Sequence, residues 1–557
     1  MLRGPFYFGI VARHIRVFQV ISLREVFVRM TRYDAIIIGA GHNGLVAAGY
    51  LARAGKKVLV LEARHLVGGA SVTEEVYPHF KYSVFSYVVS ILRPEIIRDL
   101  RLAEHGLAIL PLESTLTPLP DGRCLYRDGD PFRTWRDIAR FSRRDADAYF
   151  EYGREMFFMA KAVKYMLGIV PPDPTSLHPR DLAGLLKVGK HMAGLGEDKL
   201  FLLAKLMTMS AADFLEQWFE TDPLIATLSA SGIIGTFLGP RSPGTAYVLL
   251  HHYMGEIDGA FRAWGFARGG TGAIANAIAS SAQAFGAEIR TRARVHKVLV
   301  RNGRATGVAL ENGDEYYAGI VVSGLDPHQT FLRLVEPDEL PEDLVQAIRN
   351  FRIRGSSAKV NLALDAAPDL ACLPGDGPHL RGAISISPGV DYLERAYDDA
   401  KYGSPSREPY IDMIIPSMID PGMAPPGKHV MSCFVQYAPY SLREGSWDDQ
   451  REALGDTVVD TLSRYIPNLK DIILHRQVLT PLDIERTIGL TQGNIFQGEL
   501  SLQQLFFLRP AASWAQYRTP IRGYFQCGSG THPGGGITGA PGRLAALEIL
   551  KNWSSLR

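Results

Sequence analysis

Three glycine-rich segments dominate the chemistry that this sequence could perform. The first places Gly39, Gly41 and Gly44 in a G-x-G-x-x-G pattern, directly after an apolar run at residues 34–38. In such a pattern the first glycine makes a tight turn, the second lets backbone approach a pyrophosphate, and the third allows close packing of helix on strand. The N–H groups and the dipole at the start of the following helix would bind the phosphates. The segment therefore predicts a dinucleotide site.

A carboxylate stands where the ribose of such a nucleotide would lie. Glu62 ends a second expected strand, KVLVLE, eighteen residues after Gly44, and it can accept hydrogen bonds from ribose hydroxyls. Strand, loop, helix, strand and acid follow one another in the order that the site requires, and this order indicates dinucleotide binding. An acid at this position disfavours a 2′-phosphate, which leaves FAD or NAD rather than NADP.

The segment GSGTHPGGGITGAPGR, residues 528–543, contains seven glycines and two prolines. Taken alone, such a cluster is typical of a flexible linker. Here a strand precedes it, and a helix is expected to begin near Pro541, because proline suits the first helical turn. Bare backbone can lie against a flat ring, and a helix N-terminus would stabilise the negative charge of a reduced flavin. We interpret the segment as a flavin cradle whose contacts come from Gly528, Gly530, Thr531, Gly535, Gly536 and Ile537.

A second turn follows the acid. The residues after Glu62 read ARHLVGGAS, with the glycine pair Gly68 and Gly69. This arrangement resembles the extended fingerprint of the FAD-binding amine oxidase and phytoene desaturase superfamily, in which the pair closes a turn against the pyrophosphate. NAD-only dehydrogenases do not need that turn. The resemblance implies FAD as the cofactor, and it adds Ala63 and Arg64 to the residues expected beside the nucleotide.

Further segments narrow the resemblance. The signature G-x-G-T-H-P-G-G-G and the stretches SPGTAYVLLHHYMGE, AWGFARGGTGA and GLTQGNIFQGELSLQQLFFLRP resemble the family of pyridine nucleotide-disulfide oxidoreductase domain-containing protein 2 and its bacterial relatives. The resemblance runs from about residue 33 to 550. The disulfide chemistry of that family name does not fit the cysteines, because the closest pair, Cys372 and Cys433, is 61 residues apart. This spacing excludes a CxxC redox motif and a close-spaced zinc pair.

Residues 269–327 are expected to return the chain to the nucleotide domain. They read as a small-residue helix, a strand, a hairpin with turns at Asn302-Gly303 and Asn312-Gly313, and a final apolar strand, IVVSG. In the resembling family this unit brings the backbone around Val295 to the adenine. Alternatively, the unit is an ordinary βαβ connection that completes the edge of the sheet. The structural interpretation and the adenine-binding interpretation are compatible.

Catalytic candidates are few, because the cofactor itself accepts the hydride. Lys359, in SSAKVNLAL, resembles the lysine that flavin amine oxidases hold near N5 through a water; the alternative is a strand-end lysine that reaches solvent. His532 could donate to flavin or substrate, or could shape the cradle through a structural hydrogen bond. Adjacent His251 and His252 point in different directions on a helix or a strand, which favours a pocket wall over a metal pair. No metal site is predicted.

Length and composition fit a large globular chain. A length of 557 residues predicts two or three domains. The balance of 60 basic against 58 acidic side chains gives no indication of a nucleic-acid partner. The first thirty residues contain five arginines, one acid and no run long enough to span a membrane. A mitochondrial-type presequence, an interfacial segment and an over-called start before Met30 all remain open.

We predict an α/β fold in which a discontinuous Rossmann-type FAD-binding domain carries an inserted mixed α+β substrate domain. The amphipathic stretch WRDIARFSRRDADAYFEYGREMFFMAKAVKYM is expected to form one or two helices of the insertion, and KVNLAL and HVMSCFVQY are expected to be strands. The predicted ranges are 1–30 for a leader or over-called start, 31–105, 263–335 and 489–557 for the FAD-binding domain, and 106–262 and 336–488 for the substrate domain.

The function expected from these features is FAD-dependent oxidation, with hydride removed from an unidentified, apolar small molecule. Two alternatives stay open: a desaturase or isomerase of an isoprenoid at a membrane surface, and an FAD-binding regulatory or scaffold protein of mitochondrial function with little turnover. The resemblance and the dispersed cysteines imply an intracellular protein, cytoplasmic in a bacterium or in the mitochondrial matrix of a eukaryote, with peripheral membrane contact left open. No motif indicates the electron acceptor or the oligomeric state.

Overall fold

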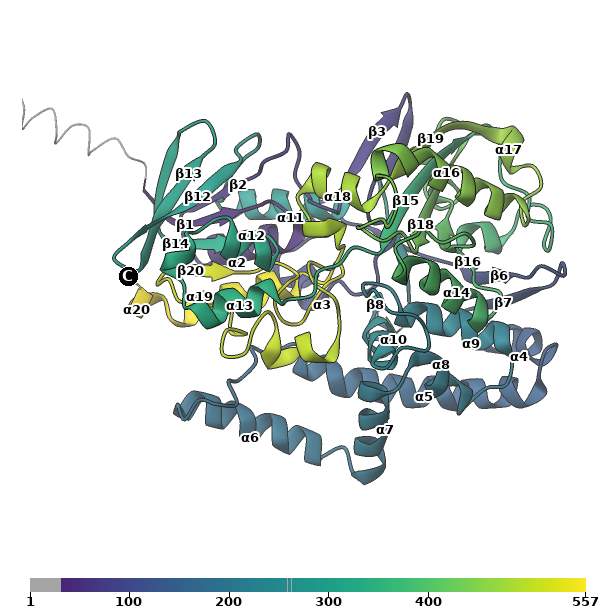
Figure 1. The fold of residues 1–557 in the computed structure, drawn as a ribbon, viewed down its shortest axis with the longest axis horizontal. Coiled ribbons are helices and arrows are strands. Elements are labelled where there is room, and N and C mark those ends of the chain that lie inside the picture. The colour runs from purple at the N-terminus through teal and green to yellow at the C-terminus, as the bar shows by residue number, and fades with distance from the viewer. Residues whose placement is uncertain (1–31, 258, 262, 557) are drawn as a thin grey trace, which may run out of the picture.

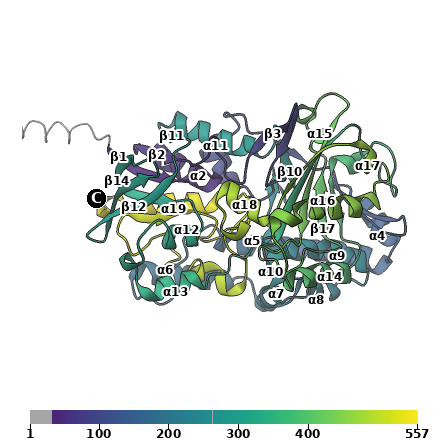
Figure 2. The ribbon, with the colours of Figure 1, turned by 45° about the horizontal axis from the view of Figure 1, so that its top comes forward.

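The computed structural model describes residues 32–257, 259–261 and 263–556. The molecule is elongated, with one large sheet toward each end (Figures 1 and 2). The leader predicted at residues 1–30 lies outside the described residues.

The first sheet has seven strands in the order β11-β2-β1-β14-β13-β12, and β20 pairs with β14 as well. The pairs among β11, β2, β1, β14 and β20 are parallel, whereas β13 pairs antiparallel with β12 and β14. The strands are β1 (Arg32–Ile38), β2 (Val58–Leu61), β11 (Glu288–Arg290), β12 (Val295–Arg301), β13 (Arg304–Leu310), β14 (Glu315–Ser323) and β20 (Tyr524–Gln526). Three distant parts of the chain supply them, so this Rossmann-type domain is discontinuous, as predicted.

Both faces of the first sheet are buried. In β1, Ala35 and Ile37 pack into one core cluster with helices α2 (His42–Arg53), α11 (Gly272–Ala284) and α19 (Ala540–Lys551). Ile36 and Ile38 point the other way, into a cluster with helices α12 (Pro327–Leu332) and α13 (Glu342–Arg349). A strand covered on both faces is apolar throughout, and this explains the run at residues 34–38.

The return unit at residues 269–327 folds as predicted. It runs through α11, β11, the β12–β13 hairpin and β14. Asn302 and Gly303 close the hairpin with φ values of 52° and 67°, the left-handed pair that a tight hairpin turn requires. The predicted C-terminal helix, α19, begins at Ala540, with Pro541 in its first turn.

The second sheet also has seven strands, in the order β19-β15-β18-β17-β16-β6-β7. All its pairs are antiparallel except β16 with β6. The strands are β6 (Ser114–Pro118), β7 (Cys124–Asp128), β15 (Ser357–Leu364), β16 (Ala383–Ile386), β17 (Tyr410–Ile414), β18 (His429–Gln436) and β19 (Ile473–Leu479). The predicted strands KVNLAL and HVMSCFVQY are β15 and β18, and they pair side by side.

The two faces of the second sheet differ. Val360 and Leu362 of β15 lie in a hydrophobic cluster with helix α16 (Trp447–Ser463). Because successive side chains of a strand alternate between faces, Lys359 and Asn361 lie on the opposite face. That face is turned toward the helices of the insertion, and it carries polar side chains.

Helices of residues 131–253 pack below the two sheets in Figure 1: α6 (Pro179–Ala193) lies below the first sheet, and the others lie below the second. The amphipathic stretch predicted as one or two helices forms two, α4 (Pro131–Ala139) and α5 (Arg143–Met166), separated at Ser142, whose side chain caps α5. The others are α6 (Pro179–Ala193), α7 (Glu197–Thr208), α8 (Ala211–Glu216), α9 (Asp222–Ser229) and α10 (Thr245–Tyr253). Within the described residues, no helix combines the length and the apolar composition of a membrane span.

Shorter elements complete the structure. Three two-stranded sheets pair β3 (Thr73–Tyr77) with β4 (Phe80–Ser83), β5 (Ile109–Pro111) with β10 (Gly265–Ala267), and β8 (Glu256–Ile257) with β9 (Ala260–Phe261). The remaining α-helices are α3 (Pro94–Asp99), α14 (Val390–Lys401), α15 (Pro416–Ile419), α17 (Leu469–Ile472), α18 (Pro481–Ile488) and α20 (Trp553–Leu556).

Candidate active site

Three neighbouring cavities extend from the first sheet to the second. We call them the nucleotide cleft, of about 540 Å³, the middle pocket, of about 140 Å³, and the polar chamber, of about 420 Å³. The cleft and the middle pocket share the lining residues His42, Ala70 and Ile495. The middle pocket and the polar chamber share Val88, Ile234, His252 and Trp264. The shared residues place the middle pocket between the nucleotide cleft and the polar chamber.

Of the predicted glycines of the first segment, Gly39 and Gly41 line the nucleotide cleft and Gly44 packs against Gly39. Gly39 has a φ of +89°, and a Cβ on Gly44 would lie 2.2 Å from the Gly39 carbonyl oxygen, so neither position accepts a larger residue. Gly41 differs, because a Cβ there would meet no protein atom within 4 Å. The N–H of Gly68 donates to the Ala40 carbonyl at 2.8 Å and brings the second glycine turn beside this open position.

Glu62 is buried behind the glycine loop. Its Oε2 accepts a hydrogen bond from the Ala40 N–H and its Oε1 accepts one from the Arg64 N–H, both at 2.8 Å. Each carboxylate oxygen has a further lone pair that a ribose hydroxyl could use. The predicted residues Ala63, Arg64 and Val295 also line the cleft, with Val295 at the start of β12.

Buried polar atoms without hydrogen-bond partners mark the cleft and its junction with the middle pocket. Those among the described lining residues are His42 Nε2, Asn43 Oδ1, Arg64 Nη1 and Ser71 Oγ. Buried polar groups are normally hydrogen-bonded. Together with the open space at Gly41, these atoms fit a polar dinucleotide in the cleft.

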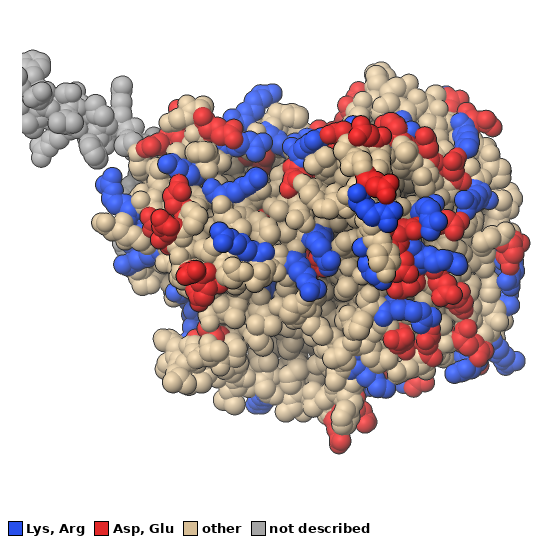
Figure 3. Space-filling model, viewed as in Figure 1, with Lys and Arg blue, Asp and Glu red and all other residues tan. Residues whose placement is uncertain are grey.

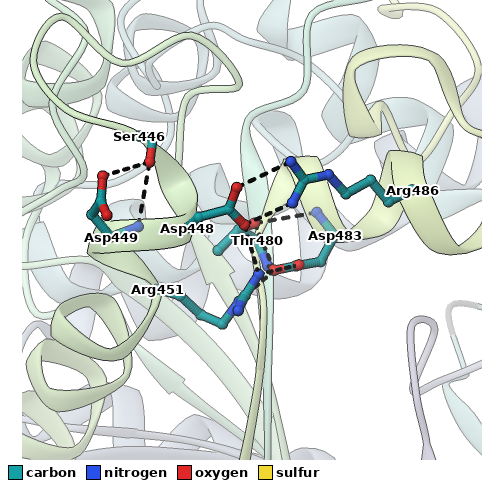
Figure 4. A network of polar contacts seen from close by, with 7 residues as sticks. All are labelled: Ser446, Asp448, Asp449, Arg451, Thr480, Asp483 and Arg486. Atoms are coloured by element: carbon teal, nitrogen blue, oxygen red, sulfur yellow. Dashed lines mark hydrogen bonds and ion pairs between the residues drawn. The ribbon is translucent and has the colours of Figure 1, made fainter.

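One wall of the cleft was not predicted. Residues 485–490, at the end of α18 and beyond it, line the nucleotide cleft. Figure 4 shows how α18 is fixed: Arg486 donates to Asp448 at 2.6 and 3.0 Å, and Arg451 donates to Asp483 at 2.6 and 3.0 Å. Asp448 and Arg451 belong to α16, so these ion pairs attach the wall to the second domain. The sequence carries a signal for the start of α18, since Thr480 and Asp483 form a capping box.

The C-terminal glycine cluster packs mainly against protein. A Cβ on Gly528 would lie 2.5 Å from the Leu325 carbonyl oxygen, one on Gly530 would lie 2.3 Å from Pro327, and one on Gly535 would lie 2.2 Å from the Phe496 ring. Thr531 turns inward, and its hydroxyl donates to the Gly528 carbonyl at 2.8 Å. Most of the predicted cradle is therefore bare because the loop itself is tightly packed.

Two cradle residues reach a cavity. Of the cradle residues predicted above, Gly536 and Ile537 line the middle pocket. They follow the tightly packed part of the loop and precede α19 directly. The loop therefore contributes a short stretch of backbone to the pocket wall.

Arg509 fixes the C-terminal glycine loop through hydrogen bonds. No sequence motif indicates this role. The side chain is completely buried and donates only to backbone carbonyls, those of Phe496, Gly498, Glu499, Gln504 and Ser529. Burial lowers the pKa of Arg509 to about 9, which leaves the guanidinium charged at neutral pH. One cation thus joins the glycine loop to residues 496–504.

Lys359 lies in the wall of the middle pocket. Only 2% of its surface is exposed, so the alternative of a strand-end lysine reaching solvent is wrong. Its Nζ donates to Asn361 Oδ1 at 2.6 Å and to Ser432 Oγ, and it lies 5.7 Å from the centre of the Tyr87 ring. Burial lowers the pKa of Lys359 to about 7. Ammonium and amine forms therefore coexist near neutral pH.

Tyr87 connects the middle pocket to the polar chamber. It lines the pocket, its ring stacks on Phe434, and its hydroxyl donates to Asp412, which lines the chamber. Burial raises the pKa of Asp412 to about 6, although the bond from Tyr87 opposes the rise. Neither Tyr87 nor Asp412 was predicted from the sequence. The available signal was an acid at the centre of the apolar strand YIDMI.

The histidines take different places. His532 is not among the described residues that line the three cavities; its Nε2 lies 3.2 Å from the Met166 carbonyl oxygen and its ring lies near Phe506. These contacts favour the loop-shaping alternative for His532. His252 lines both the middle pocket and the polar chamber and stacks on Trp264. In the described part of the chain, no cluster of histidine, cysteine or acidic residues could hold a metal ion.

Comparisons with known proteins agree with this geometry. Residues 44–550 match the family model described as flavin containing amine oxidoreductase. Pyridine nucleotide-disulfide oxidoreductase domain-containing protein 2 of Rattus norvegicus is 41% identical, with 94% of each chain covered. A limonene dehydrogenase subunit of Castellaniella defragrans is 26% identical over 93% of this chain and 94% of that protein. The solved structure of wild-type putrescine oxidase bound to putrescine shares the fold, with a TM-score of 0.57 at 17% identity, covering 93% and 99% of the two chains.

The substitution Gly41→Val tests the nucleotide cleft. Gly41 has an ordinary φ of −65°, so valine fits the backbone, while its side chain would occupy the open cleft. We expect FAD occupancy of the purified protein to fall about tenfold or more, since close approach of the pyrophosphate is lost. The measurement is the ratio of flavin to protein absorbance, with the melting temperature of the apoprotein recorded in parallel.

Gly153→Val is the matched control. A Cβ on Gly153, in α5, also meets no protein atom within 4 Å, but it lies away from the cleft. This variant should keep full FAD occupancy. Wild-type occupancy in Gly41→Val would contradict the assignment of the cleft.

Proposed function

This chain belongs to the flavin containing amine oxidoreductase family and is an FAD-dependent oxidoreductase; we propose that it removes hydride from the apolar part of a small organic molecule held in the middle pocket. Bound FAD supplies the hydride acceptor and later passes the electrons to an external acceptor. The observation that carries the proposal is the buried amine of Lys359 in the wall of an apolar pocket adjacent to the nucleotide cleft.

The lining of the middle pocket supports an apolar reacting group. Aromatic and aliphatic side chains dominate it, and they are Phe85, Tyr87, Val88, Val89, Ile91, Ile234, Trp264, Phe434, Ile484, Ile495, Phe496 and Ile537. Such walls exclude water and offer little to a charged group, whose desolvation would cost several kcal/mol. A neutral, apolar part of a substrate fits them best.

Lys359 would hold a proton beside the reacting groups. Its three polar or aromatic neighbours, Asn361, Ser432 and Tyr87, all favour the ammonium form, whereas burial favours the amine. A positive charge in this pocket would stabilise the negative charge that an acceptor such as oxygen gains when it takes up an electron. That charge is present below the folded pKa of about 7 and is lost as the pH rises through it.

We expect reoxidation of the dithionite-reduced protein to slow as the pH rises from 6 to 8, with a midpoint near the pKa of about 7. Lys359→Met should reoxidise about tenfold or more slowly at pH 6, with little dependence on pH, because the titrating charge is gone. The measurement is stopped-flow absorbance of the flavin on mixing with oxygen or with a soluble quinone.

Lys428→Met provides the matched control. Lys428 precedes β18 on the same domain, but it is partly exposed and pairs with Asp365. Its variant should show the wild-type pH profile. An unchanged rate and profile in Lys359→Met with both acceptors would remove Lys359 from the site.

A second candidate is oxidation or isomerisation of an isoprenoid at a membrane surface. Large apolar side chains are exposed on and beside α6 and α7, with Leu177, Leu186 and Phe201 at 86%, 74% and 63% exposure. The surface over α6 is largely free of charge in Figure 3. The similarity to the limonene dehydrogenase subunit also supports an isoprenoid substrate. A membrane-facing helix pair would suit delivery of a water-insoluble substrate.

Anaerobic reduction of the bound flavin tests the apolar substrate class against a charged amine and against the scaffold role. A terpene such as limonene, a long-chain alcohol, putrescine and NADH are each added to the FAD-loaded protein, and bleaching is followed. We expect an apolar donor to reduce the flavin at least about tenfold faster than putrescine, whose two charges the middle pocket would have to desolvate. Faster reduction by putrescine would overturn the apolar substrate class. Bound FAD that no donor reduces would favour the regulatory or scaffold role.

A further inference from the structure

One row of side chains crosses the second sheet from the middle pocket into the polar chamber. In register, Lys359 of β15 lies opposite Phe434, Phe434 opposite Asp412, and Asp412 opposite Ser385. The row then shifts by two residues along β16 to Ala383, which lies opposite Thr115 of β6, and Thr115 lies opposite Arg127. Residues directly opposite each other share a face. All members of the row line the middle pocket or the polar chamber.

The row ends at Arg127, on the edge strand β7. Its side chain is about nine-tenths buried, yet Nε has no hydrogen-bond partner. Nη1 and Nη2 make only long contacts of 3.4 Å, to the hydroxyls of Tyr149 and Thr227. Within the described part of the chain, no carboxylate forms an ion pair with Arg127. A buried guanidinium without an acid is an expensive arrangement unless a ligand supplies the anion.

The acids of the chamber are engaged elsewhere. Glu113 pairs with Arg381 at 2.9 Å, and Asp128 pairs with Arg133 at 3.0 Å. Asp412 accepts the hydroxyl of Tyr87 toward the middle pocket. Among the described residues that line the chamber, Arg127 is therefore the cation that has no acidic partner. Hydroxyls from Ser114, Thr115, Thr227, Ser231 and Ser385 surround the same space.

We propose that the polar chamber binds the anionic headgroup of an amphipathic substrate, with Arg127 pairing to an anionic oxygen group, a carboxylate or a phosphate monoester. The planar guanidinium fork matches either group through two parallel hydrogen bonds. The apolar part of the same molecule lies in the middle pocket beside Lys359. This assignment rests on the proposed function of the middle pocket and specifies the substrate class for that site.

The spacing of the sheet sets the scale of such a molecule. Arg127 and Lys359 stand on strands separated by five inter-strand steps, in the order β15-β18-β17-β16-β6-β7. At about 4.8 Å for each step, their backbones are about 24 Å apart. The headgroup and the reacting carbon therefore lie toward opposite ends of a long chain, and the wall shared by the two cavities contacts its middle.

Calorimetric titration of the FAD-loaded protein tests the assignment. The probes are dodecanoate, dodecyl phosphate, dodecan-1-ol and dodecylamine, which share one tail and differ in headgroup. We expect at least one anion to bind about tenfold or more tightly than the alcohol and the amine, with the tighter anion identifying the headgroup. Arg127→Gln should weaken that anion about tenfold or more, and Arg127→Lys should weaken it less, because lysine keeps the charge but loses the fork.

Arg123→Gln is the matched control, since Arg123 lies in the turn between β6 and β7 but is half exposed, pairs with Asp121 and does not line the chamber. It should bind the probes within about twofold of wild type. Equal affinity for all four probes, or an unchanged anion affinity in a folded Arg127→Gln, would overturn the headgroup assignment. Because heat of binding requires no turnover, flavin reduction that persists after such a result leaves the proposed function standing. Anion binding through Arg127 in a protein whose flavin accepts no electrons would instead count against the proposed function alone.

Discussion

The interior of the site depends on one buried guanidinium. Arg509 donates to five carbonyls and joins the C-terminal glycine loop to residues 496–504. Leaving a buried carbonyl without a donor costs about 1–3 kcal/mol, so losing this single side chain would affect several such groups at once. Both joined segments contribute to the wall of the middle pocket, through Ile495 and Phe496 on one side and Gly536 and Ile537 on the other. The pocket therefore takes its shape from a hydrogen-bonding centre that does not line it.

The second constraint is that the two faces of the second sheet carry different side chains. One face packs against α16 in a hydrophobic core. The other face projects Lys359, Asp412 and Arg127 into successive cavities. Burial then acts differently on each group, lowering the pKa of the lysine and raising that of the aspartate. The same alternation of side chains that builds the core thus positions the groups available for chemistry.

The local patterns of the nucleotide domain could be predicted from the sequence. The glycine motif, the acid at Glu62, the return unit and the start of α19 each depend on residues close together in the chain. The polar row across the second sheet could not be predicted in this way, because it arises from strand order and register among residues 115 to 434. The wall at residues 485–490 was missed for a similar reason: its place at the cleft depends on ion pairs to α16.

The glycine cluster shows a second limit of sequence interpretation. Its composition indicates that side chains are excluded, but not what excludes them. Gly528, Gly530 and Gly535 are crowded by Leu325, Pro327 and Phe496, and even Gly536, which lines the middle pocket, would place a Cβ 2.3 Å from the Ile91 side chain. Lys359 illustrates the opposite case. The sequence did not decide whether this lysine lies near the cofactor or reaches solvent, and the fold shows that it is buried.

The most direct test of FAD binding in the open cleft is the visible spectrum of the purified protein, together with the FAD released on denaturation. We expect a yellow protein with a band near ~450 nm and about one FAD for each chain. A colourless protein that also takes up no added FAD would contradict this expectation, because the open cleft at Gly41 and the unpartnered polar atoms around it would then lack the ligand that explains them.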